Sequence, residues 1–270
     1  MDAMNPAAAN VTDDQGDAVT LRGTVRRVVS LVPSLTEAIA ATGPELLVGA
    51  TRYCTHPANL EVHQVGGTKN PDIAAIVALR PDLVLANEEE NRVPDLDALR
   101  AAGLPVWVTV VRDLDQALGS LHRMLTVACG LPRPAWLDEA EDAWARAVRP
   151  APPITAIVPI WRRPWMVLGR DTFAGDLLHR LGVRNRYDDH PERYPRIDLP
   201  ELHASDAELV VLPDEPYQFT ADDGPEAFPD LPAALVSGRH LTWYGPSLTE
   251  APDVLTRQLK SLTLPRPHRF

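Results

Sequence analysis

Short apolar runs alternate with helical patterns along most of the chain. In the first part, four apolar runs have the length of buried strands, and they span residues 28–32, 47–50, 82–86 and 106–111. After the first run, Ser34 and Glu37 have the spacing of a helix capping box, and Gly43 is typical of a helix end. This alternation predicts a mainly parallel sheet that helices cover on both faces.

One part of this pattern occurs twice. Residues 72–85 (DIAAIVALRPDLVL) are echoed by residues 198–211 (DLPELHASDAELVV). Each copy has the pattern of an aspartate helix cap, two turns of helix with one apolar face, a short turn and a buried strand. The repeat indicates two similar lobes, and clefts between domains are common binding places for small molecules.

The region between the two copies has a different pattern. Residues 114–149 are helical and amphipathic, with a break at 130–134 (GLPRP). A long helical connection of this kind predicts a stiff spine between the lobes. Beyond it we expect strands at 154–160, 166–168 and 240–243, and helices at 173–181 and 251–262.

The expected fold class is α/β, with two Rossmann-like lobes, mainly parallel sheets, a long helical spine and a ligand cleft between the lobes. The expected lobes cover residues 25–113 and 151–264, the spine covers 114–150, and a short tail covers 265–270. Residues 1–24 are expected to be a disordered tail, because residues 1–20 carry four Asp and no apolar run.

Composition and charge exclude several functional classes. Of the 270 residues, 45% are hydrophobic and 23% are charged, as in ordinary globular proteins. The formal net charge of −11 disfavours nucleic acid and anionic lipid as partners. No apolar run reaches the roughly 18 residues that a membrane span needs. Residues 1–20 lack the features of a secretory signal, so we expect a cytoplasmic location unless a signal was removed.

With these motifs assembled, the chain resembles the class III periplasmic substrate-binding proteins. Within them it is most similar to the cobalamin and iron-siderophore group, the helical-backbone metal receptors. The resemblance covers about residues 25–264 and rests on the order of SLVPSLTE, VALRPDLVLA and GRDTFAGDLLHRLG, which start at residues 30, 77 and 169. It implies two α/β lobes, a rigid connecting helix and a ligand held in the cleft with little hinge closure.

The chain departs from this family at the positions that face an ABC permease. The resemblance implies one glutamate just after the N-cap of each repeat helix, but Ala74 and Pro200 occupy these positions. Glu201 is one residue away, which rotates a helical side chain by about 100°. Conventional docking to a permease is therefore not expected.

A second departure lies among the aromatic residues that line the cleft in cobalamin-binding relatives. Tyr53 and Tyr194 match two of these positions, whereas Thr68 and Asn87 stand where tryptophans would be expected. A flat corrin face needs apolar contact area, so the loss of two tryptophans puts cobalamin specificity in question.

An acidic run follows the third predicted strand, where a parallel sheet presents its carboxyl edge to a ligand. We expect Glu88 or Glu89, with Asn87 or Asn91, to meet a cationic or metal-bearing ligand. The alternative is a solvated acidic loop.

The WRRPW turn at residues 161–165 follows a strand of the second lobe. In the functional interpretation, a planar ligand stacks on Trp161 or Trp165, and Arg162 or Arg163 binds a carboxylate or phosphate. The alternative is that the Trp rings pack against the spine.

Several further residues complete the candidate site. Cys54 or His56 could supply a metal ligand from a loop, although loop histidines are often simply solvated. Lys69 and Arg170 are candidate rim contacts, and Asp171 has the alternative role of a helix cap. The full set of candidate ligand-binding residues is Pro33, Ser34, Tyr53, Cys54, Lys69, Asn87, Glu88, Glu89, Trp161, Arg162, Arg163, Trp165, Arg170 and Tyr194.

No catalytic constellation is present in the sequence. The chain has no Gly-x-Ser-x-Gly, His-Glu-x-x-His, phosphate-binding glycine loop or Cys-x-x-Cys motif. We therefore expect no catalytic residues, no resident metal site and no covalent cofactor. The expected function is the binding of a small metal chelate, a corrinoid, haem or ferric siderophore, by a monomer. The alternatives are an enzyme that acts on the bound ligand through Glu88, Glu89 and Arg162, and a transport component with atypical docking.

Overall fold

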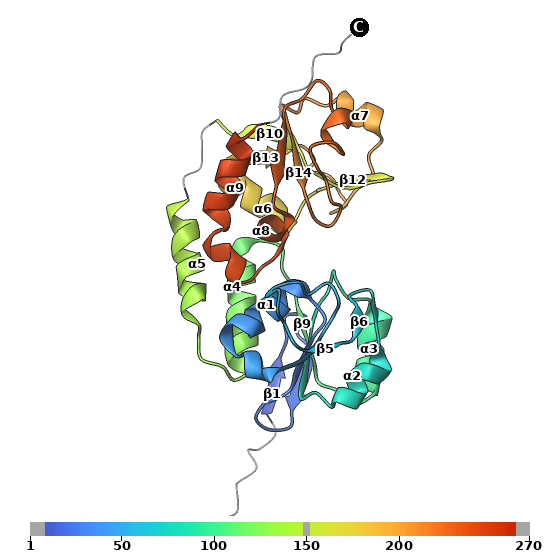
Figure 1. Cartoon of the computed structure of the whole chain (residues 1–270), viewed down its shortest axis with the longest axis vertical. Coiled ribbons are helices and arrows are strands. Elements are labelled where there is room, and N and C mark those ends of the chain that lie inside the picture. The colour runs from blue at the N-terminus through green and yellow to red at the C-terminus, as the bar shows by residue number, and fades with distance from the viewer. Residues whose placement is uncertain (1–8, 148–151, 263–270) are drawn as a thin grey trace, which may run out of the picture. The chain divides into compact units, whose positions relative to one another are not determined.

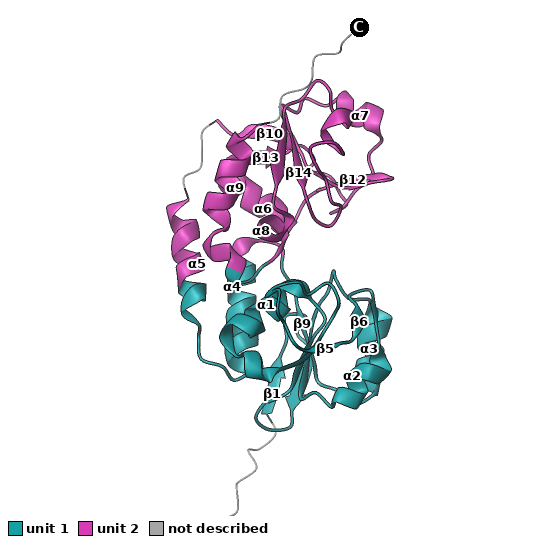
Figure 2. Ribbon diagram, in the orientation of Figure 1, with its two compact units in different colours: residues 1–111, 115–138, 244–246 teal, residues 112–114, 139–243, 247–270 magenta. Residues whose placement is uncertain are grey.

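The chain folds into two compact units, each with its own parallel sheet (Figures 1 and 2). The computed structural model describes residues 9–147 and 152–262. Unit 1 comprises residues 1–111, 115–138 and 244–246, and unit 2 comprises residues 112–114, 139–243 and 247–270. The expectation of an α/β fold with mainly parallel sheets is confirmed.

The sheet of unit 1 has five parallel strands in the order β5-β4-β3-β8-β9. Their bounds are β3 (Val28–Ser30), β4 (Leu47–Ala50), β5 (His63–Gln64), β8 (Leu83–Asn87) and β9 (Val106–Thr109). The connecting elements are α1 (Pro33–Thr42), η1 (Pro44–Leu46), the small β6 (Gly66–Gly67) and β7 (Asn70–Pro71) hairpin, α2 (Ile73–Leu79) and α3 (Val93–Ala101). All of β8 and β9 is buried, which explains why both read as continuous apolar runs.

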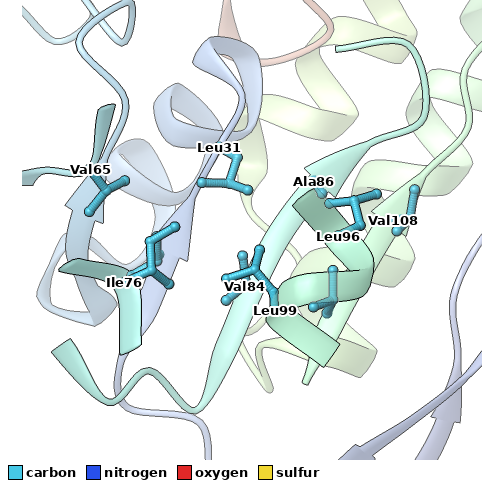
Figure 3. Close-up of a cluster of buried hydrophobic side chains, with 10 residues drawn as sticks. Leu31, Val65, Ile76, Val84, Ala86, Leu96, Leu99 and Val108 are labelled. Carbon is cyan, nitrogen blue, oxygen red and sulfur yellow. The ribbon is translucent and has the colours of Figure 1, made fainter. Parts of the chain in front are cut away.

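One core cluster of unit 1 joins the sheet to α2 and α3 (Figure 3). Ile76 of α2 and Leu99 of α3 are fully buried in the same cluster as Val84 of the interior strand β8. Burial of such a side chain contributes roughly 1.5–3 kcal/mol relative to exposure. This cluster fixes the carboxyl ends of the strands, where the candidate residues begin.

The N-terminal segment forms a hairpin instead of the expected disordered tail. Strands β1 (Ala9–Thr12) and β2 (Ala18–Leu21) pair antiparallel. In their turn, Asp13 Oδ2 accepts a hydrogen bond from the amide of Val108 at 3.2 Å, and the amide of Asp14 donates to the carbonyl of Val108 at 3.2 Å. The expectation is therefore wrong for residues 9–21, because polar turn residues that suit solvent also satisfy the open edge of β9. Residues 1–8 lie outside the described part.

The first helix also begins differently from the prediction. Val32 is its N-cap and Pro33 its first residue, so Ser34 lies inside the first turn and no capping box forms. Proline favours the first helical position because its fixed φ suits a helix and its missing N–H needs no partner. Ser34 and Glu37 are both buried.

The predicted spine consists of three helical pieces. They are α4 (Leu114–Arg123), the π-helical turn η2 (Met124–Ala128) and α5 (Ala135–Arg146), separated at the predicted break. The indole Nε1 of Trp136 donates to Thr42 Oγ1 at 3.0 Å, and Trp144 Nε1 donates to the carbonyl of Leu248 at 3.1 Å. The end of the predicted spine at residues 148–150 lies outside the described residues.

The sheet of unit 2 has four parallel strands in the order β13-β10-β14-β15. Their bounds are β10 (Ile154–Ile157), β13 (Val183–Asn185), β14 (Leu209–Pro213) and β15 (Ala233–Val236). The predicted strand at 154–160 is divided, because β11 (Pro159–Arg162) leaves the sheet to pair with β12 (Trp165–Val167).

Helices and turns complete unit 2. They are α6 (Phe173–Arg180), α7 (Leu199–His203), η3 (Pro225–Ala227), α8 (Gly238–Thr242), η4 (Pro246–Thr249) and α9 (Ala251–Lys260). The predicted strand at 240–243 is wrong because α8 occupies this place. Within that segment Leu241 is buried while both of its neighbours are partly exposed, a pattern that a helix satisfies as well as a strand.

The sequence repeat corresponds to two helix–strand pairs, α2–β8 and α7–β14. In the first copy, Asp72 caps the helix by accepting from the amide of Ala75 at 2.9 Å. In the second copy Asp198 is again the N-cap residue, but its side chain makes no capping hydrogen bond. The repeat therefore predicts the elements correctly, whereas the details of the cap differ.

Candidate functional site

Asn87 organises the acidic loop at the end of β8. Its side-chain amide donates to Thr109 O at 3.0 Å and to Thr109 Oγ1 at 3.2 Å, and its Oδ1 accepts from the amides of Glu89 and Glu90. Asn91 also bonds to Asn87, because Oδ1 of Asn91 accepts a hydrogen bond from the backbone amide of Asn87 at 2.9 Å. Asn87 and Asn91 are both buried, so they hold the loop in shape.

Glu88 and Glu89 are the half-buried acids of this loop. Nζ of Lys69 donates to the carbonyl oxygen of Glu89, which ties the exposed lysine to the loop. Thr68, at the position where a tryptophan was expected, is buried, and its carbonyl accepts from Asn91 Nδ2 at 3.0 Å. The structure thus places Lys69, which the sequence offered as a rim contact, beside the acidic loop.

Tyr53 is an exposed aromatic candidate residue in unit 1. It lies in the loop that follows β4 with 55% of its surface exposed, and the guanidinium of Arg52 stacks 5.5 Å from its ring centroid. Sequence reasoning missed Arg52, which could have been noticed because it adjoins the aromatic position. The pair presents an aromatic face and a positive charge beyond the carboxyl edge of the sheet.

Cys54 and Ser34 are held by neighbouring hydroxyl groups. The thiol of Cys54 lies 3.0 Å from Thr36 Oγ1 and 3.3 Å from Thr51 Oγ1, and burial raises its pKa, which disfavours the thiolate. Ser34 hydrogen-bonds the phenol of Tyr244, whose pKa is raised mainly by burial. Pro33, the first residue of α1, is partly exposed.

The WRRPW turn connects β11 and β12, and its two tryptophans have different environments. Trp165 is partly buried and packs against the core of unit 2, where its ring stacks on Phe219 at 6.2 Å between centroids and meets Phe228 edge-on at 5.3 Å. Trp161 is 42% exposed and meets the ring of Tyr217 edge-on at 5.6 Å. Packing therefore accounts for Trp165, and Trp161 is the tryptophan that a ligand can reach.

The two arginines of the turn also differ in their environments, since one is paired within unit 2 and the other is exposed. Arg162 forms ion pairs with Asp223 and Glu226, and its guanidinium lies 5.5 Å from the ring centroid of Trp165. Arg162 therefore links the WRRPW turn to the segment that carries Asp223 and Glu226. Arg163 is exposed.

Arg170 lines a pocket of about 260 Å³ within unit 2, at the start of α6. Arg112, Asp171, Asp188 and His179 are among the other charged or titratable residues of its wall. Arg170 Nε lies 3.5 Å from Asp171 Oδ2, and the side chain of the following Thr172 is the actual helix cap, since it accepts from the amide of Gly175.

Tyr194 is partly exposed, and the guanidinium of Arg193 lies 5.5 Å from its ring centroid. The structure therefore gives this predicted aromatic the same kind of arginine neighbour that Tyr53 has in unit 1.

Sequence reasoning missed the residues that follow β14. Glu215 Oε2 accepts a hydrogen bond from Trp243 Nε1 at 2.9 Å, and burial raises the pKa of Glu215 above its ordinary value. Asp214 Oδ1 accepts from the amide of Gly238, and Tyr217 donates to Asp223 Oδ2 at 2.7 Å. The signal was present, because these residues follow a buried strand in the same way as the acidic loop of unit 1.

The described residues contain no group of three or more His, Cys, Asp or Glu side chains that could hold a metal ion. The ring Nδ1 of His56 lies 3.1 Å from Thr55 Oγ1.

Comparisons with known proteins give a consistent result. The family model described as "Periplasmic binding protein" matches residues 28–230. The vitamin B12-binding protein of Yersinia pestis is 23% identical over 253 residues, which cover 88% of this chain and 88% of the relative. The same values hold for the protein of that name from Yersinia pseudotuberculosis.

Solved structures of such proteins have the same fold. The periplasmic heme-binding protein RhuT from Roseiflexus sp. RS-1 superposes with a TM-score of 0.72 at 22% identity, covering 87% of this chain and 97% of its own. The periplasmic vitamin B12-binding protein BtuF of Vibrio cholerae superposes with a TM-score of 0.68 at 17% identity and the same coverage.

The family description points to the periplasm, so the cytoplasmic location expected from the sequence is wrong. That expectation rested on the composition of residues 1–20 alone. Among the helices of the described residues, none is long and apolar enough to cross a membrane.

Proposed function

Because the chain belongs to the periplasmic binding protein family, we propose that it binds a small metal chelate of the corrinoid, haem or ferric siderophore class. The relatives and solved structures named above carry the names of vitamin B12-binding and heme-binding proteins. All three ligand classes combine a large, partly apolar body with polar or charged groups at the periphery. Aromatic side chains with nearby positive charge suit such a body.

The observation that carries the proposal is that each unit exposes a large aromatic side chain just beyond its sheet. Tyr53 follows β4 in unit 1, and Trp161 lies in the hairpin that follows β10 in unit 2. An exposed aromatic ring offers a flat apolar face on which a large ligand can stack. We assign Tyr53 and Trp161 as stacking surfaces, with Arg52, Lys69, Arg163 and Arg170 as peripheral charges.

Other predicted residues support the site indirectly. Asn87 shapes the acidic loop, Arg162 anchors the WRRPW turn, and Trp165 packs against the core. We assign them as positioning residues. Glu88 and Glu89 remain candidates for ligand contact because both are half-buried at the carboxyl edge.

Titration of the purified protein with cyanocobalamin, hemin and a ferric siderophore tests the proposal. Ligand absorbance and the melting temperature should both change for one of the three classes. For that ligand, Tyr53→Ala and Trp161→Ala should each weaken binding by about tenfold, the equivalent of 1.4 kcal/mol. Val127→Ala, which changes an exposed residue of η2, should bind as the wild type does. No response to any class at micromolar concentration would overturn the proposal.

We also propose that the ligand is bound without being chemically changed. The enzymatic alternative needs Glu88, Glu89 and Arg162 to act on it, but Arg162 is already paired with two carboxylates. Mass spectrometry of ligand recovered after long incubation should show an unaltered mass. A converted product that depends on Glu88 would establish the alternative instead.

For transport, we propose that docking to a permease does not use a pair of glutamates. Ala74 and Pro200 are both exposed in the first turns of α2 and α7, and Glu201 is an exposed acid beside Pro200. Glu201→Ala should therefore leave ligand uptake by cells unchanged. Loss of uptake at unaltered ligand affinity would contradict this. The monomeric state stays a prediction, which sedimentation would test.

A further inference from the structure

A second pocket lies in unit 1 at the opposite edge of the sheet from the candidate site. Strands β8 and β9 end at Asn87 and Thr109 beside the acidic loop, and they begin at the pocket. The pocket has a volume of about 330 Å³ and is formed by the segment between β2 and β3, the C-terminal ends of α2 and α3, and the residues before β8 and β9. Its walls include Arg22, Val25, Val77, Arg80 and Leu104.

The neighbouring polar groups already have partners. The carbonyl of Leu79, at the end of α2, accepts from Arg27 Nε at 3.0 Å and from Arg27 Nη2 at 2.8 Å. Asp82, the acid of the pocket wall, accepts from the amides of Arg26 and Arg27 at 2.9 Å each. Arg27 therefore satisfies the helix end, and the carboxylate of Asp82 is occupied with the backbone.

Arg22 and Arg80 have no such role. Within the described residues, neither guanidinium has an ion pair or a hydrogen bond, and both side chains are exposed. Nη2 of Arg22 lies over the backbone of Gly103, 4.0 Å from where a Cβ would stand. Two unneutralised arginines in one pocket are notable in a chain with a net charge of −11.

The backbone of Arg80 strengthens this observation. Arg80 follows α2 in the left-handed conformation with φ +46°, which glycine adopts without strain and other residues adopt at a cost. The helix cap itself uses only the backbone N–H of Arg80, which donates to the carbonyl of Val77, so the cap does not involve the guanidinium.

We propose that this pocket binds a small organic monocarboxylate with an apolar body. Guanidinium groups match the geometry of a carboxylate, and Val25, Val77 and Leu104 offer apolar contact to the rest of such a molecule. The ends of α2 and α3 in the wall are C-terminal and carry partial negative charge, which opposes any anion and opposes a dianion such as phosphate more than a monocarboxylate. The site is separate from the one that holds the metal chelate.

Benzoate, acetate and phosphate at matched ionic strength are the probes for this site. Benzoate should raise the melting temperature and bind in calorimetry, acetate should bind more weakly because it has little apolar surface, and phosphate should not bind. Arg22→Gln and Arg80→Gly should each weaken benzoate binding by about tenfold or more, and metal-chelate binding should stay unchanged. Arg26→Gln is the matched control, because this exposed arginine uses only its backbone amide in the pocket region.

The Arg80→Gly variant also separates binding from structure. If the side chain serves a ligand, glycine relieves the strained φ and raises the melting temperature without benzoate. A lower melting temperature in this variant would instead mean that Arg80 is structural and would overturn the proposal. Benzoate binding that is absent in the wild type, that survives both substitutions, or that is lost equally in Arg26→Gln, would overturn it too.

Discussion

The indole Nε1 of Trp243 donates a hydrogen bond to Glu215 Oε2 at 2.9 Å, which links the residue after α8 to the end of β14. Gly238 approaches the backbone of the same glutamate so closely that a Cβ would lie 2.5 Å from its nitrogen. Burial is the largest influence on Glu215 and raises its pKa above 4.5. Unit 2 therefore holds a carboxyl group in a fixed place where its charge is disfavoured.

Glu215 predicts a specific pH dependence of stability. Because its pKa is raised in the folded chain, the folded state holds this proton more tightly than the unfolded state does. Its ionisation therefore destabilises the fold above the folded pKa, and this cost disappears as the pH falls through the folded pKa to below 4.5. Glu215→Gln keeps an acceptor for Trp243, so it should be at least as stable as the wild type at neutral pH, and its advantage should shrink in acid.

Urea unfolding of both proteins across the acid range gives the difference between their free energies of unfolding. The carboxyl groups that both proteins share contribute equally, so their effects cancel in this difference. Asp189→Asn, which replaces an exposed acid of the same unit, is the control for the removal of one carboxylate. Glu215→Ala should be less stable by about 1–3 kcal/mol, since it leaves the indole N–H without its acceptor. A difference between Glu215→Gln and wild type that grows towards low pH would refute the assignment.

The N-terminal hairpin should contribute measurably to the stability of unit 1. Asp14 is only 9% exposed and pairs with Arg123 at 2.7 Å between Oδ1 and Nη1, while its Oδ2 accepts from the amide of Val110 and from Ser120. Asp14→Ala removes all of these acceptors and should lower the free energy of unfolding by about 2–3 kcal/mol. Asp17→Ala, which changes a 60% exposed acid of the same hairpin, should cost less than about 0.5 kcal/mol. Equal effects in denaturant melts would mean that the hairpin does not anchor through Asp14.

Two glycine substitutions should have opposite effects. A Cβ at Gly169 would lie 2.1 Å from the carbonyl oxygen of Glu192, so Gly169→Ala should destabilise by about 1–3 kcal/mol. Gly119 is exposed within α4 and a Cβ there meets nothing within 4 Å, so Gly119→Ala should stabilise by about 0.5–1 kcal/mol. Denaturation midpoints that move in the same direction would contradict the close contact at Gly169.

The two tryptophans of the WRRPW turn should separate stability from binding. Trp165→Ala should cost about 3 kcal/mol, because the ring packs against Phe219 and Phe228. Trp161→Ala should change stability by less than about 1 kcal/mol, since the ring is partly solvated. Chemical denaturation gives both values, and a large loss of stability from Trp161→Ala would show that its exposed ring is structural.

The repeat at Asp72 and Asp198 shows how far local pattern reaches. It predicted two helix–strand pairs correctly, because burial of one helix face and of a whole strand leaves a periodic signal in the residues themselves. The same reasoning failed for the hairpin at residues 9–21, whose partner is the edge strand β9, almost a hundred positions away. In a sequence, polar residues that hydrogen-bond to a distant backbone look the same as polar residues that hydrogen-bond to water, so the hairpin could not be predicted from its composition.

In the candidate site, too, local sequence predicted some features and long-range contacts decided the others. Position after a buried strand selected the acidic loop, the Tyr53 loop and the WRRPW turn as candidate segments, and the structure places each of them directly after a strand or in a strand hairpin. It could not separate Trp161 from Trp165 or Arg162 from Arg163, because these residues differ only in the rings and carboxylates that other segments bring to them. It also passed over Glu215, whose interest depends on Trp243.

By itself, the sequence determined the α/β class, the helix–strand repeat, the break in the spine and the family resemblance, since each is encoded in local periodicity and motif order. Only the tertiary structure decided which side chains a ligand can reach. Asn87, Arg162 and Trp165 were good candidates by type and position, but long-range contacts use their polar groups and surfaces within the fold. No other part of the fold covers the side chains of Tyr53, Trp161, Arg22 and Arg80, which are therefore exposed. Exposure depends on what the rest of the chain covers, so sequence position alone could not predict it.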